Sequence, residues 1–365
     1  EGAAGSLISP CPAAPPRPIL GNSASWFHGA HLDNFAAVLP PAAEGAAEAC
    51  TWSQRFYVNA TWCAQDGCPV FLYIGGEGPL SPHAVGPRLF MHEAAERHGA
   101  MVVALEHRYF GESWPTEDMR TDYLARYLSS AQALADIARF RQWFPAHAAA
   151  DASLKRYSLA GSPWVGFGGS YPGNLAAWVK VRFPHLFAGT VASSAPLTAV
   201  EEWPGYMQVV GSALKHFGGD GSSGSGSTCF ASVSAAGNAI AVKLASDAGL
   251  AELSKLFKTC GDHPMSSANT SQLDLQTFAS NVVGSWQGLV QYNRPAPRTS
   301  SVARMCGELN ARVDGGASPL EAFAATTLDM AEAPFVARNI STKYCTEISD
   351  SDSIAQLKNT TFDGV

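Results

Sequence analysis

The stretch GFGGSYPGNLAAW, residues 166–178, contains a serine whose surroundings are those of a nucleophile. An apolar, strand-like run ends at two glycines, Ser170 follows, and a helix-like run begins directly after it. A strand, a tight turn and a helix in this order form a nucleophile elbow, which exposes the serine hydroxyl. The motif GxSxG is met at Gly168 and Ser170, whereas Pro172 occupies its last position and Gly173 comes one residue later. The alternative interpretation is that these residues only turn a strand into a helix.

Two segments offer backbone N–H groups to the oxyanion of a tetrahedral intermediate. Tyr171 follows the nucleophile, and Pro172 leaves the Tyr171 N–H intact although it disfavours the helical conformation at that residue. The stretch IGGEGP, 74–79, follows another predicted strand and offers the N–H groups of Gly76 and Glu77. Donors at these three positions would form an oxyanion hole. The Glu77 side chain could instead bind the N-terminal amine of a substrate.

Alternating strands and helices are expected around this serine. Four apolar runs bounded by Gly or Pro are typical of buried parallel strands, at 70–75, 101–106, 164–169 and 187–194. Helix-like segments lie between them, at 87–99, 129–144 and 172–183. This rhythm indicates an α/β domain with right-handed crossovers. Upstream, QRFYVNATW, 54–62, alternates like an antiparallel edge strand of a hairpin.

After residue 197 the pattern changes to amphipathic helices, at 201–217, 235–257 and 271–292. A Gly/Ser-rich loop, 218–229, lies among them. We therefore expect the N-terminal part of an α/β domain over 1–197 and a helical insertion over 198–340. The segment 341–365 is expected to begin the return to the α/β domain.

Charge and composition argue against several classes of partner. The net charge is −7 with a pI near 5.8, and no basic run points to nucleic acid or to an anionic membrane surface. No stretch approaches the roughly 20 apolar residues of a membrane-spanning helix. The cysteine spacings do not suit a zinc site. We expect no metal, no cofactor, no nucleic acid and no membrane span.

Cysteines and glycosylation motifs together favour the secretory pathway. The 8 cysteines are even in number and contain no CxxC pair, as expected of disulfides formed in an oxidising compartment. Four N-glycosylation motifs are present, at Asn59, Asn269, Asn339 and Asn359. The first residues, EGAAGSLISPCP, lack the pattern of an intact signal peptide.

Five blocks of this sequence resemble the serine peptidase family that includes lysosomal Pro-Xaa carboxypeptidase, dipeptidyl peptidase II and thymus-specific serine protease. They are YIGGEGP, LEHRYFGES, YLSSAQALAD, SPWVGFGGSYPGNLAAWVKVRFPHLFAGTVASSAPLTAV and QGLVQYN, in the family's order. The thymus-specific branch is the most similar. The resemblance implies an α/β-hydrolase fold with a helical cap, and an acyl-enzyme formed on Ser170. Pro172 departs from the Gly or Ala that is usual there, which puts the elbow geometry in question.

The family's catalytic acid and histidine follow the nucleophile in motifs that this chain does not contain. The histidines after Ser170 are His185, His216 and His263, none of which we expect to be catalytic, and for His107 we expect a structural or pocket-shaping role. The sequence therefore predicts a chain that stops before the acid and the base, which a C-terminal segment would supply. The expected activity is that of a prolyl-bond exopeptidase. The alternative is a catalytically silent secreted glycoprotein that serves as a structural or binding subunit. A lipase or esterase is disfavoured.

Further features follow from the resemblance. Trp286 and Tyr292 could line a pocket for the substrate proline, or could pack in the core of the cap. For the Glu106–Arg108 pair we prefer a buried ion-pair network. The family pattern suggests two bridges, Cys229–Cys306 and Cys260–Cys345, and leaves Cys63–Cys68 and Cys11–Cys50 as a guess. The expected location is the lysosome, the vacuole or the extracellular space, and the expected partner is a peptide substrate, with a homodimer left open.

Overall fold

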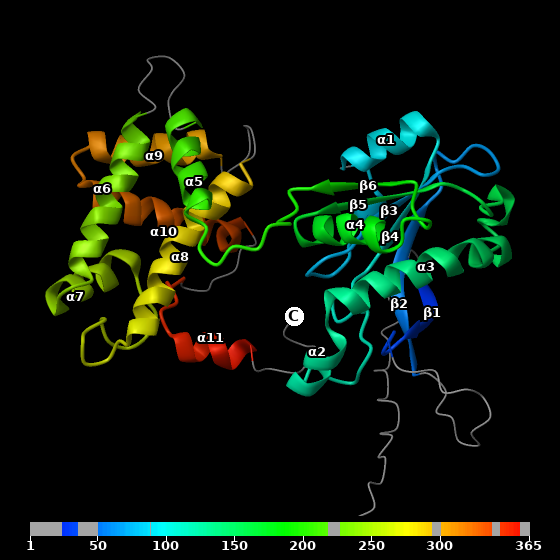
Figure 1. Ribbon diagram of the computed structural model, residues 1–365. Helices are drawn as coiled ribbons and strands as arrows, with labels where there is room; N and C mark the ends of the chain where they lie inside the picture. Colours follow the sequence, from blue (N-terminus) through cyan, green and yellow to red (C-terminus); the bar gives the residue numbers. More distant parts are fainter. Residues whose placement is uncertain are drawn as a thin grey trace, which may run out of the picture. The chain divides into compact units, whose positions relative to one another are not determined.

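The computed structural model describes residues 24–35, 50–87, 89–217, 227–293, 301–337 and 344–357 (Figure 1). The chain forms two compact units. The described residues up to Ala199 form the first unit, and Val200–Asn359 forms the second. The expected boundary stands two residues earlier, at 197. The segment from 344 to 357, expected to begin the return to the first unit, groups with the second.

The first unit is built on a six-stranded sheet whose strand order is β1-β2-β4-β3-β5-β6. The strands are β1 (Ser25–His31), β2 (Thr51–Asn59), β3 (Val70–Ile74), β4 (Met101–Leu105), β5 (Trp164–Gly169) and β6 (Gly189–Ser193). β3 pairs in parallel with β4 and β5, and β5 pairs in parallel with β6. β2 is antiparallel to β4 and to β1. The mixed sheet, with a serine turn directly after β5, is that of an α/β-hydrolase, so the expected fold class is confirmed.

Each of the four predicted strands is present, but β6 is half-buried to exposed instead of buried, and the antiparallel strand is not at the edge. β2 lies between β1 and β4, and β1 occupies the edge of the described sheet. The expectation of an edge strand at 54–62 is therefore wrong. Alternation along β2 indicates only that its two faces differ, and cannot show whether a second strand covers its free side.

Helices cover both faces of the sheet, and the alternation of β3 shows how. Val70, Leu72 and Ile74 belong to a large core cluster with residues of α3 (Ser130–Ala150) and α4 (Tyr171–Arg182). Phe71 packs on the opposite face with residues of α1 (Phe90–His98). A further helix, α2 (Thr121–Tyr127), precedes α3. Two 3-10 turns, η1 (Pro82–Val85) and η2 (Lys155–Tyr157), complete the unit.

The second unit consists of helices alone in its described residues, apart from one isolated bridge, Thr259 to Thr346. They are α5 (Pro204–Phe217), α6 (Ser227–Lys243), α7 (Asp247–Phe257), α8 (Gln272–Gln291), α9 (Val302–Asp314), α10 (Pro319–Ala337) and α11 (Asp350–Leu357). The single helix expected at 235–257 is two helices. Ser246 caps α7 by accepting a hydrogen bond from Gly249 N–H at 3.2 Å, and serine at this position favours a helix start over continuation.

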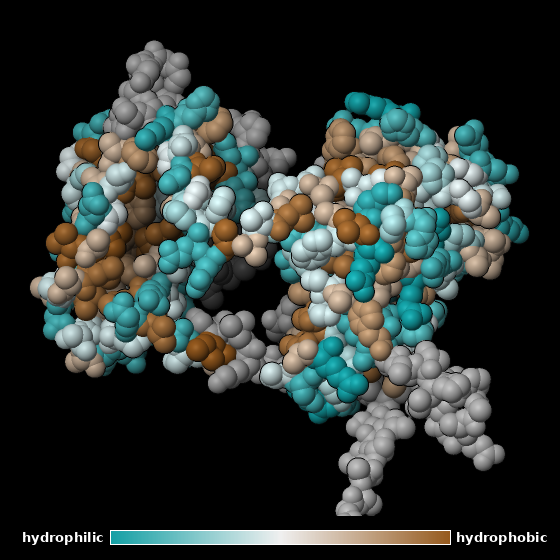
Figure 2. All heavy atoms as spheres, viewed as in Figure 1, coloured by the Kyte–Doolittle hydropathy of each residue, from teal (hydrophilic) through white to brown (hydrophobic). Residues whose placement is uncertain are grey.

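The second unit has its own hydrophobic core, around Leu253, Phe257, Phe278 and Phe323. Apolar side chains also remain on its surface: Figure 2 shows a hydrophobic area over α6 and α7, and Val242 of α6 is 74% exposed. No helix among the described residues has both the length and the apolar character needed to cross a membrane.

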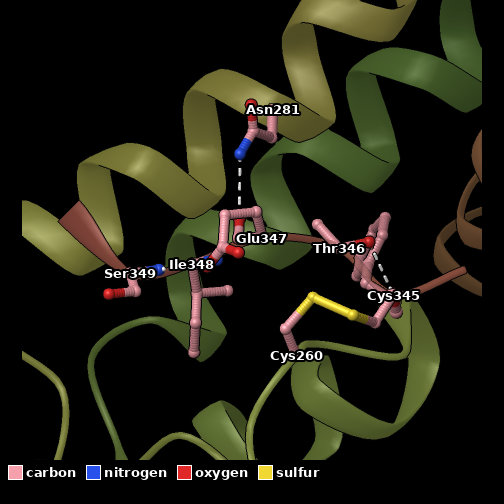
Figure 3. Close-up of a disulfide and its surroundings, with 8 residues drawn as sticks. Cys260, Asn281, Cys345, Thr346, Glu347, Ile348 and Ser349 are labelled. Atoms are coloured by element: carbon pink, nitrogen blue, oxygen red, sulfur yellow. Dashed lines mark hydrogen bonds between the residues drawn. A yellow bond between two sulfur atoms is a disulfide. The ribbon is translucent and has the colours of Figure 1, made fainter. Parts of the chain in front are cut away.

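Disulfides join distant parts of the second unit. Cys229 is bonded to Cys306, and Cys260 to Cys345, the two pairs that the family resemblance implies. Figure 3 shows the second bridge, with the residues from Cys345 to Ser349 beside Cys260 and Asn281. Thr346 N–H donates to Lys258 O at 2.9 Å. The Asn281 side chain donates to Glu347 O at 2.8 Å. Covalent and hydrogen bonds thus fix this segment to α7 and α8.

The first unit contains the short bridge Cys63–Cys68. Cys50 is also in a disulfide. Cys11, the partner guessed for Cys50, lies outside the described residues.

Candidate active site

Ser170 occupies a strained turn between β5 and α4. Its backbone has φ 60° and ψ −133°, a conformation that costs free energy in a residue with a Cβ atom. Ser170 N–H donates to Ser193 O at 3.0 Å, and Ser170 O accepts from Gly173 N–H at 2.8 Å. The turn is therefore held between β6 and the first turn of α4. The Ser170 side chain lies on the exposed surface, as a nucleophile elbow requires.

Close crossing of the strand and the helix explains two of the glycines around Ser170. A Cβ atom at Gly168 would lie 1.9 Å from Pro172 O, and one at Gly173 would lie 2.8 Å from Ser193 O. At Gly169 a Cβ atom would meet nothing within 4 Å. Close backbone therefore excludes a side chain at Gly168 and at Gly173, one on each side of the serine, but not at Gly169.

Pro172 does not disturb the elbow. It lies at the second position of α4, where a proline removes no intrahelical hydrogen bond. The helix begins at Tyr171, directly before the proline, because the tertiary contacts of the elbow outweigh the local preference against a helical residue there.

The loop after β3 lies against this first turn of α4. A Cβ atom at Gly76 would lie 2.5 Å from Pro172 Cγ, so the backbone of Gly76 packs directly on the proline ring. Gly75 N–H donates to Leu105 O at 2.9 Å, and Gly78 N–H donates to Gly76 O at 2.9 Å. Gly76 and Tyr171 are thus brought to the same corner of the site.

The N–H groups proposed as oxyanion donors have no acceptor among the described residues. Neither Gly76 nor Glu77 donates its N–H to another backbone group, and the same holds for Tyr171 at the start of α4. A free N–H at a helix start carries part of the positive end of the helix dipole. The Tyr171 N–H at the start of α4 can therefore stabilise a developing negative charge, and the free N–H groups of Gly76 and Glu77 belong to the loop that packs against the same turn.

A buried carboxylate anchors the far end of this loop. Glu106, directly after β4, is 1% exposed and accepts a hydrogen bond from Leu80 N–H at 2.8 Å. It also accepts from Arg55 Nη2 at 2.5 Å, and Arg55 in turn bonds Glu112 at 2.8 Å. Gly111 makes room for the carboxylate, since a Cβ atom there would lie 2.0 Å from Glu106 Oε1. Glu106 therefore joins β2 to the loops that follow β3 and β4.

The expected Glu106–Arg108 ion-pair network is wrong, because each residue has another partner. Arg108 is fully buried and pairs with Asp136 of α3 through two hydrogen bonds of 2.6 Å. Its remaining N–H groups donate to three backbone carbonyls, those of His31, Leu32 and Tyr127. The partners come from elements distant in the sequence, and the spacing of two residues within EHR could not identify them.

The Tyr171 hydroxyl belongs to a buried hydrogen-bond chain that the sequence did not suggest. His107 Nδ1 lies 2.8 Å from Arg108 O, a carbonyl that can only accept, so Nδ1 carries the proton. His107 Nε2 therefore accepts from the Tyr171 hydroxyl at 3.0 Å. The same hydroxyl lies 3.4 Å from Ser130 Oγ, which completes the chain as the donor. Burial lowers the pKa of His107 and raises the pKa of Tyr171, which keeps both groups neutral.

None of the histidines considered above is placed as a general base in this structure. His107 bonds to the Tyr171 hydroxyl and to a backbone carbonyl, not to Ser170. His185, His216 and His263 are exposed, and the last two belong to the second unit. The geometry thus places Ser170 in a strained turn next to N–H groups that have no acceptor, and within the described ranges no histidine is hydrogen-bonded to Ser170.

The two aromatic residues proposed for the substrate pocket have different environments. Trp286 is 2% exposed, stacks on Phe323 at 5.2 Å and donates its indole N–H to Thr327 Oγ1 at 2.9 Å. It is a core residue of the second unit, so its interpretation as a pocket wall is corrected in favour of packing. Tyr292, at the end of α8, is 65% exposed.

Two of the four glycosylation motifs can be placed. Asn269 is exposed, and Asn59 is half-buried with its side-chain amide donating to Val85 O at 2.8 Å. Asn339 and Asn359 lie outside the described residues. In the part of the chain that the structure describes, no group of three or more His, Cys, Asp and Glu side chains is arranged to hold a metal ion.

Comparison with known proteins now decides the family. The family model described as serine carboxypeptidase S28 matches residues 44–364. The chain belongs to this family. Mouse (Mus musculus) thymus-specific serine protease is 36% identical over 317 residues, which are 85% of this chain and 56% of that protein. Mouse lysosomal Pro-X carboxypeptidase is 29% identical over 253 residues, which are 69% of this chain and 47% of that protein.

This S28 chain therefore spans about half the length of the relatives it matches. Among solved structures, an esterase of Pyrobaculum calidifontis has a TM-score of 0.32 and 15% identity, and the match covers 53% of this chain and 52% of the esterase. The expected resemblance to the thymus-specific and Pro-X families is confirmed by the family match and by the two mouse relatives.

Proposed function

We propose that this protein is the nucleophile-bearing part of a serine peptidase that cleaves at prolyl residues near the end of a peptide. The observation that carries the proposal is the elbow at Ser170, with φ 60° and ψ −133°, beside the unpaired N–H groups of Tyr171, Gly76 and Glu77. Membership of the S28 family and the name of the Pro-X carboxypeptidase support the preference for proline.

In the proposed reaction, Ser170 Oγ attacks the carbonyl carbon of the scissile peptide bond and loses its proton to a histidine. The carbonyl oxygen becomes an oxyanion, which the N–H groups of Tyr171 and of Gly76 or Glu77 stabilise. The histidine then protonates the leaving amine, and the acyl group remains on Ser170. Water then attacks this ester with the histidine again acting as base, the histidine returns the proton to Ser170 Oγ, and the peptide fragment leaves with a free carboxylic acid.

We propose that the acid and the histidine come from a C-terminal segment outside the described residues. The relatives are about twice as long as the aligned part, which leaves room for such a segment. In the described sheet β6 pairs only with β5, and Val191 of β6 is 38% exposed. A strand with one free edge can accept a further strand, which would bring new side chains to the carboxyl end of the sheet near Ser170.

We propose that the protein enters the secretory pathway and works in the lysosome, the vacuole or the extracellular space. We further propose that it is a glycoprotein and that its substrate is a peptide. The three disulfides whose cysteines are both described, the further disulfide at Cys50 and the exposed motif at Asn269 support this location. A homodimer stays a proposal to be tested by mass measurement in solution. The second candidate is a silent binding subunit, which is favoured by the lack of a hydrogen-bonded base at Ser170 within the described residues.

Fluorophosphonate labelling of the native, full-length protein separates these two functions. Label on the peptide that contains Ser170, absent from a Ser170→Ala variant and from heat-denatured protein, is expected for the peptidase. A folded, glycosylated sample that takes no label would reject the peptidase and leave the binding subunit. Peptide pairs that differ only by proline or alanine before the scissile bond, with free or amidated C-termini, then test the prolyl preference and the exopeptidase action.

A further inference from the structure

The ring of Pro172 lies on the side of Gly76 where a Cβ atom would stand. A Cβ atom at Gly76 would lie 2.5 Å from Pro172 Cγ and 2.9 Å from Pro172 Cδ, and its third neighbour, at 4.0 Å, is Pro172 Cβ. All three nearest heavy atoms thus belong to one side chain. Gly76 has a φ outside the left-handed region, so backbone strain does not exclude a larger residue there. Contact with Pro172 alone excludes it.

Pro172 is itself rigidly placed. Its ring fixes φ, and it is buried at the second position of α4. Its carbonyl lies so close to Gly168 that no side chain fits between them, and Gly173, the next residue, is pressed against Ser193 O. The ring therefore projects from the crossing of β5, β6 and α4, which is the most constrained part of the elbow.

The loop that carries Gly76 and Glu77 is held mainly at its two ends. Gly75 N–H bonds to Leu105 O at one end, and Leu80 N–H bonds to Glu106 at the other. Between them, among the described residues, the only backbone bond is the tight one from Gly78 N–H to Gly76 O. Without the proline ring, the middle of the loop would have open space on the side of α4, and the N–H groups could move away from the position of the oxyanion.

We infer that Pro172 is a positioning residue, which sets the distance between the oxyanion loop and Ser170 by packing its ring on Gly76. This inference rests on the proposed peptidase function, because it assigns the N–H groups of Gly76 or Glu77 to the oxyanion. Donors fixed before the reaction stabilise the transition state at no cost of reorganisation. A loop that can drift loses this advantage in the chemical step, while substrate binding elsewhere is kept.

Two substitutions at position 172 remove the ring and test the inference. In Pro172→Ala and Pro172→Gly we expect the rate of fluorophosphonate labelling and kcat to fall about 10-fold, less than the roughly 10² to 10³ for complete loss of an oxyanion donor. The KM for a peptide substrate should change less than about 2-fold, because the lost interaction acts in the transition state. A 10-fold rise in KM with an unchanged kcat would overturn the inference, because the lost interaction would then act in substrate binding and not in the transition state.

A double-mutant cycle identifies the contact itself. Gly76→Ala places a methyl group against Pro172, so we expect a loss of 100-fold or more in kcat in the native background. In the Pro172→Gly background the same methyl group has space, and Gly76→Ala should cost less than about 3-fold. Gly78→Ala is the matched control, since a Cβ atom there meets nothing within 4 Å and its effect should be the same in both backgrounds. Equal losses from Gly76→Ala in the two backgrounds would refute the contact.

Amide hydrogen exchange provides a readout that does not depend on activity. The Gly78 N–H, which donates to Gly76 O, should exchange at least 5-fold faster in Pro172→Ala than in the native protein, while amides of β3 and β5 keep their rates. An unchanged rate at Gly78 would reject the positioning role even if Ser170 is a nucleophile. Faster exchange in a protein that takes no fluorophosphonate would instead retain the packing role and reject the peptidase function.

Discussion

Replacing Glu106 by glutamine should destabilise the first unit and, in the same variant, loosen the loop that carries Gly76 and Glu77. The side chain is buried and accepts four hydrogen bonds, two on each oxygen. Oε1 accepts from Arg55 at 2.5 Å and from Leu80 N–H at 2.8 Å. Oε2 accepts from Glu112 N–H at 3.0 Å and from Ser113 Oγ at 2.7 Å. The shape of the side chain is kept in Glu106→Gln, so only its charge and one acceptor are lost.

The size of the effect follows from this count. Glutamine has one oxygen, so in either orientation two of the four donors face an NH2 group instead of an acceptor. Each hydrogen bond to a charged group contributes about 1.5–3 kcal/mol, which gives a loss of about 3–6 kcal/mol. Removing one partner of a buried ion pair costs about 3–5 kcal/mol. The two ranges agree on a decrease of about 3–5 kcal/mol in the free energy of unfolding.

Native-state hydrogen exchange of the β3 and β4 amides over a urea series measures this loss in the first unit alone. Glu112→Gln is the matched control, because Glu112 pairs with the same Arg55 through one hydrogen bond of 2.8 Å at a partly exposed position. It should cost about 1 kcal/mol or less. A Glu106→Gln variant within about 1 kcal/mol of the native protein, or a Glu112→Gln variant as unstable as it, would show that the carboxylate is not the anchor.

Three further predictions concern the rest of the chain. Removing the Cys260–Cys345 bridge with two Ser substitutions should lower the free energy of unfolding of the second unit by about 4.6 kcal/mol in the chain-entropy model, because 85 residues separate the cysteines. Hydrogen exchange of the α7 and α8 amides measures this free energy. A decrease of less than about 1 kcal/mol would contradict the prediction. Burial lowers the pKa of His107 below its ordinary value of 6.5. Below pH 6.5 the unfolded chain therefore binds more protons at this residue than the folded chain does. The free energy of unfolding then decreases as the pH decreases, by at most about 1.4 kcal/mol per pH unit from this group. The melting temperature of His107→Gln should therefore decrease less than that of the native protein between pH 6.5 and 5, whereas the exposed His83→Gln should follow the native curve; parallel curves for all three would reject the role of His107. Trp286→Ala should cost about 3–5 kcal/mol in the second unit and leave β3 and β4 exchange unchanged, and a stable variant with altered peptide specificity would restore the pocket interpretation.

Local patterns in the sequence were sufficient for the elements that carry the nucleophile. The strands β3, β4, β5 and β6 were predicted because continuous apolar runs between Gly and Pro residues are typical of strands that are buried on both faces. Ser170, Tyr171, Gly76 and Glu77 follow directly from these strands, since each lies at a carboxyl end. The disulfides Cys229–Cys306 and Cys260–Cys345 came from the family resemblance, because spacing alone does not define a pairing.

Predictions failed where the answer depends on a partner far along the chain. The position of β2 inside the sheet requires β1, a strand that contains two histidines and a glycine and shows no clear apolar pattern. Glu106 and Arg108 pair with residues of β2 and α3, 51 and 28 positions away. Trp286 would be apolar and aromatic in a pocket as well as in a core, so only its neighbours distinguish the two.

By itself the sequence determined the position of a serine at the end of a parallel strand, which it predicts to be a nucleophile, with glycine-rich turns able to donate N–H groups and a helical region after it. The tertiary structure alone decided which of these groups meet. Pro172 and Gly76 lie nearly a hundred residues apart, and their packing depends on the order of β3 beside β5 and on the close crossing of β5 with α4. Periodicity and turn chemistry are local properties, whereas the geometry of a site is set by contacts between segments that only the folded chain brings together.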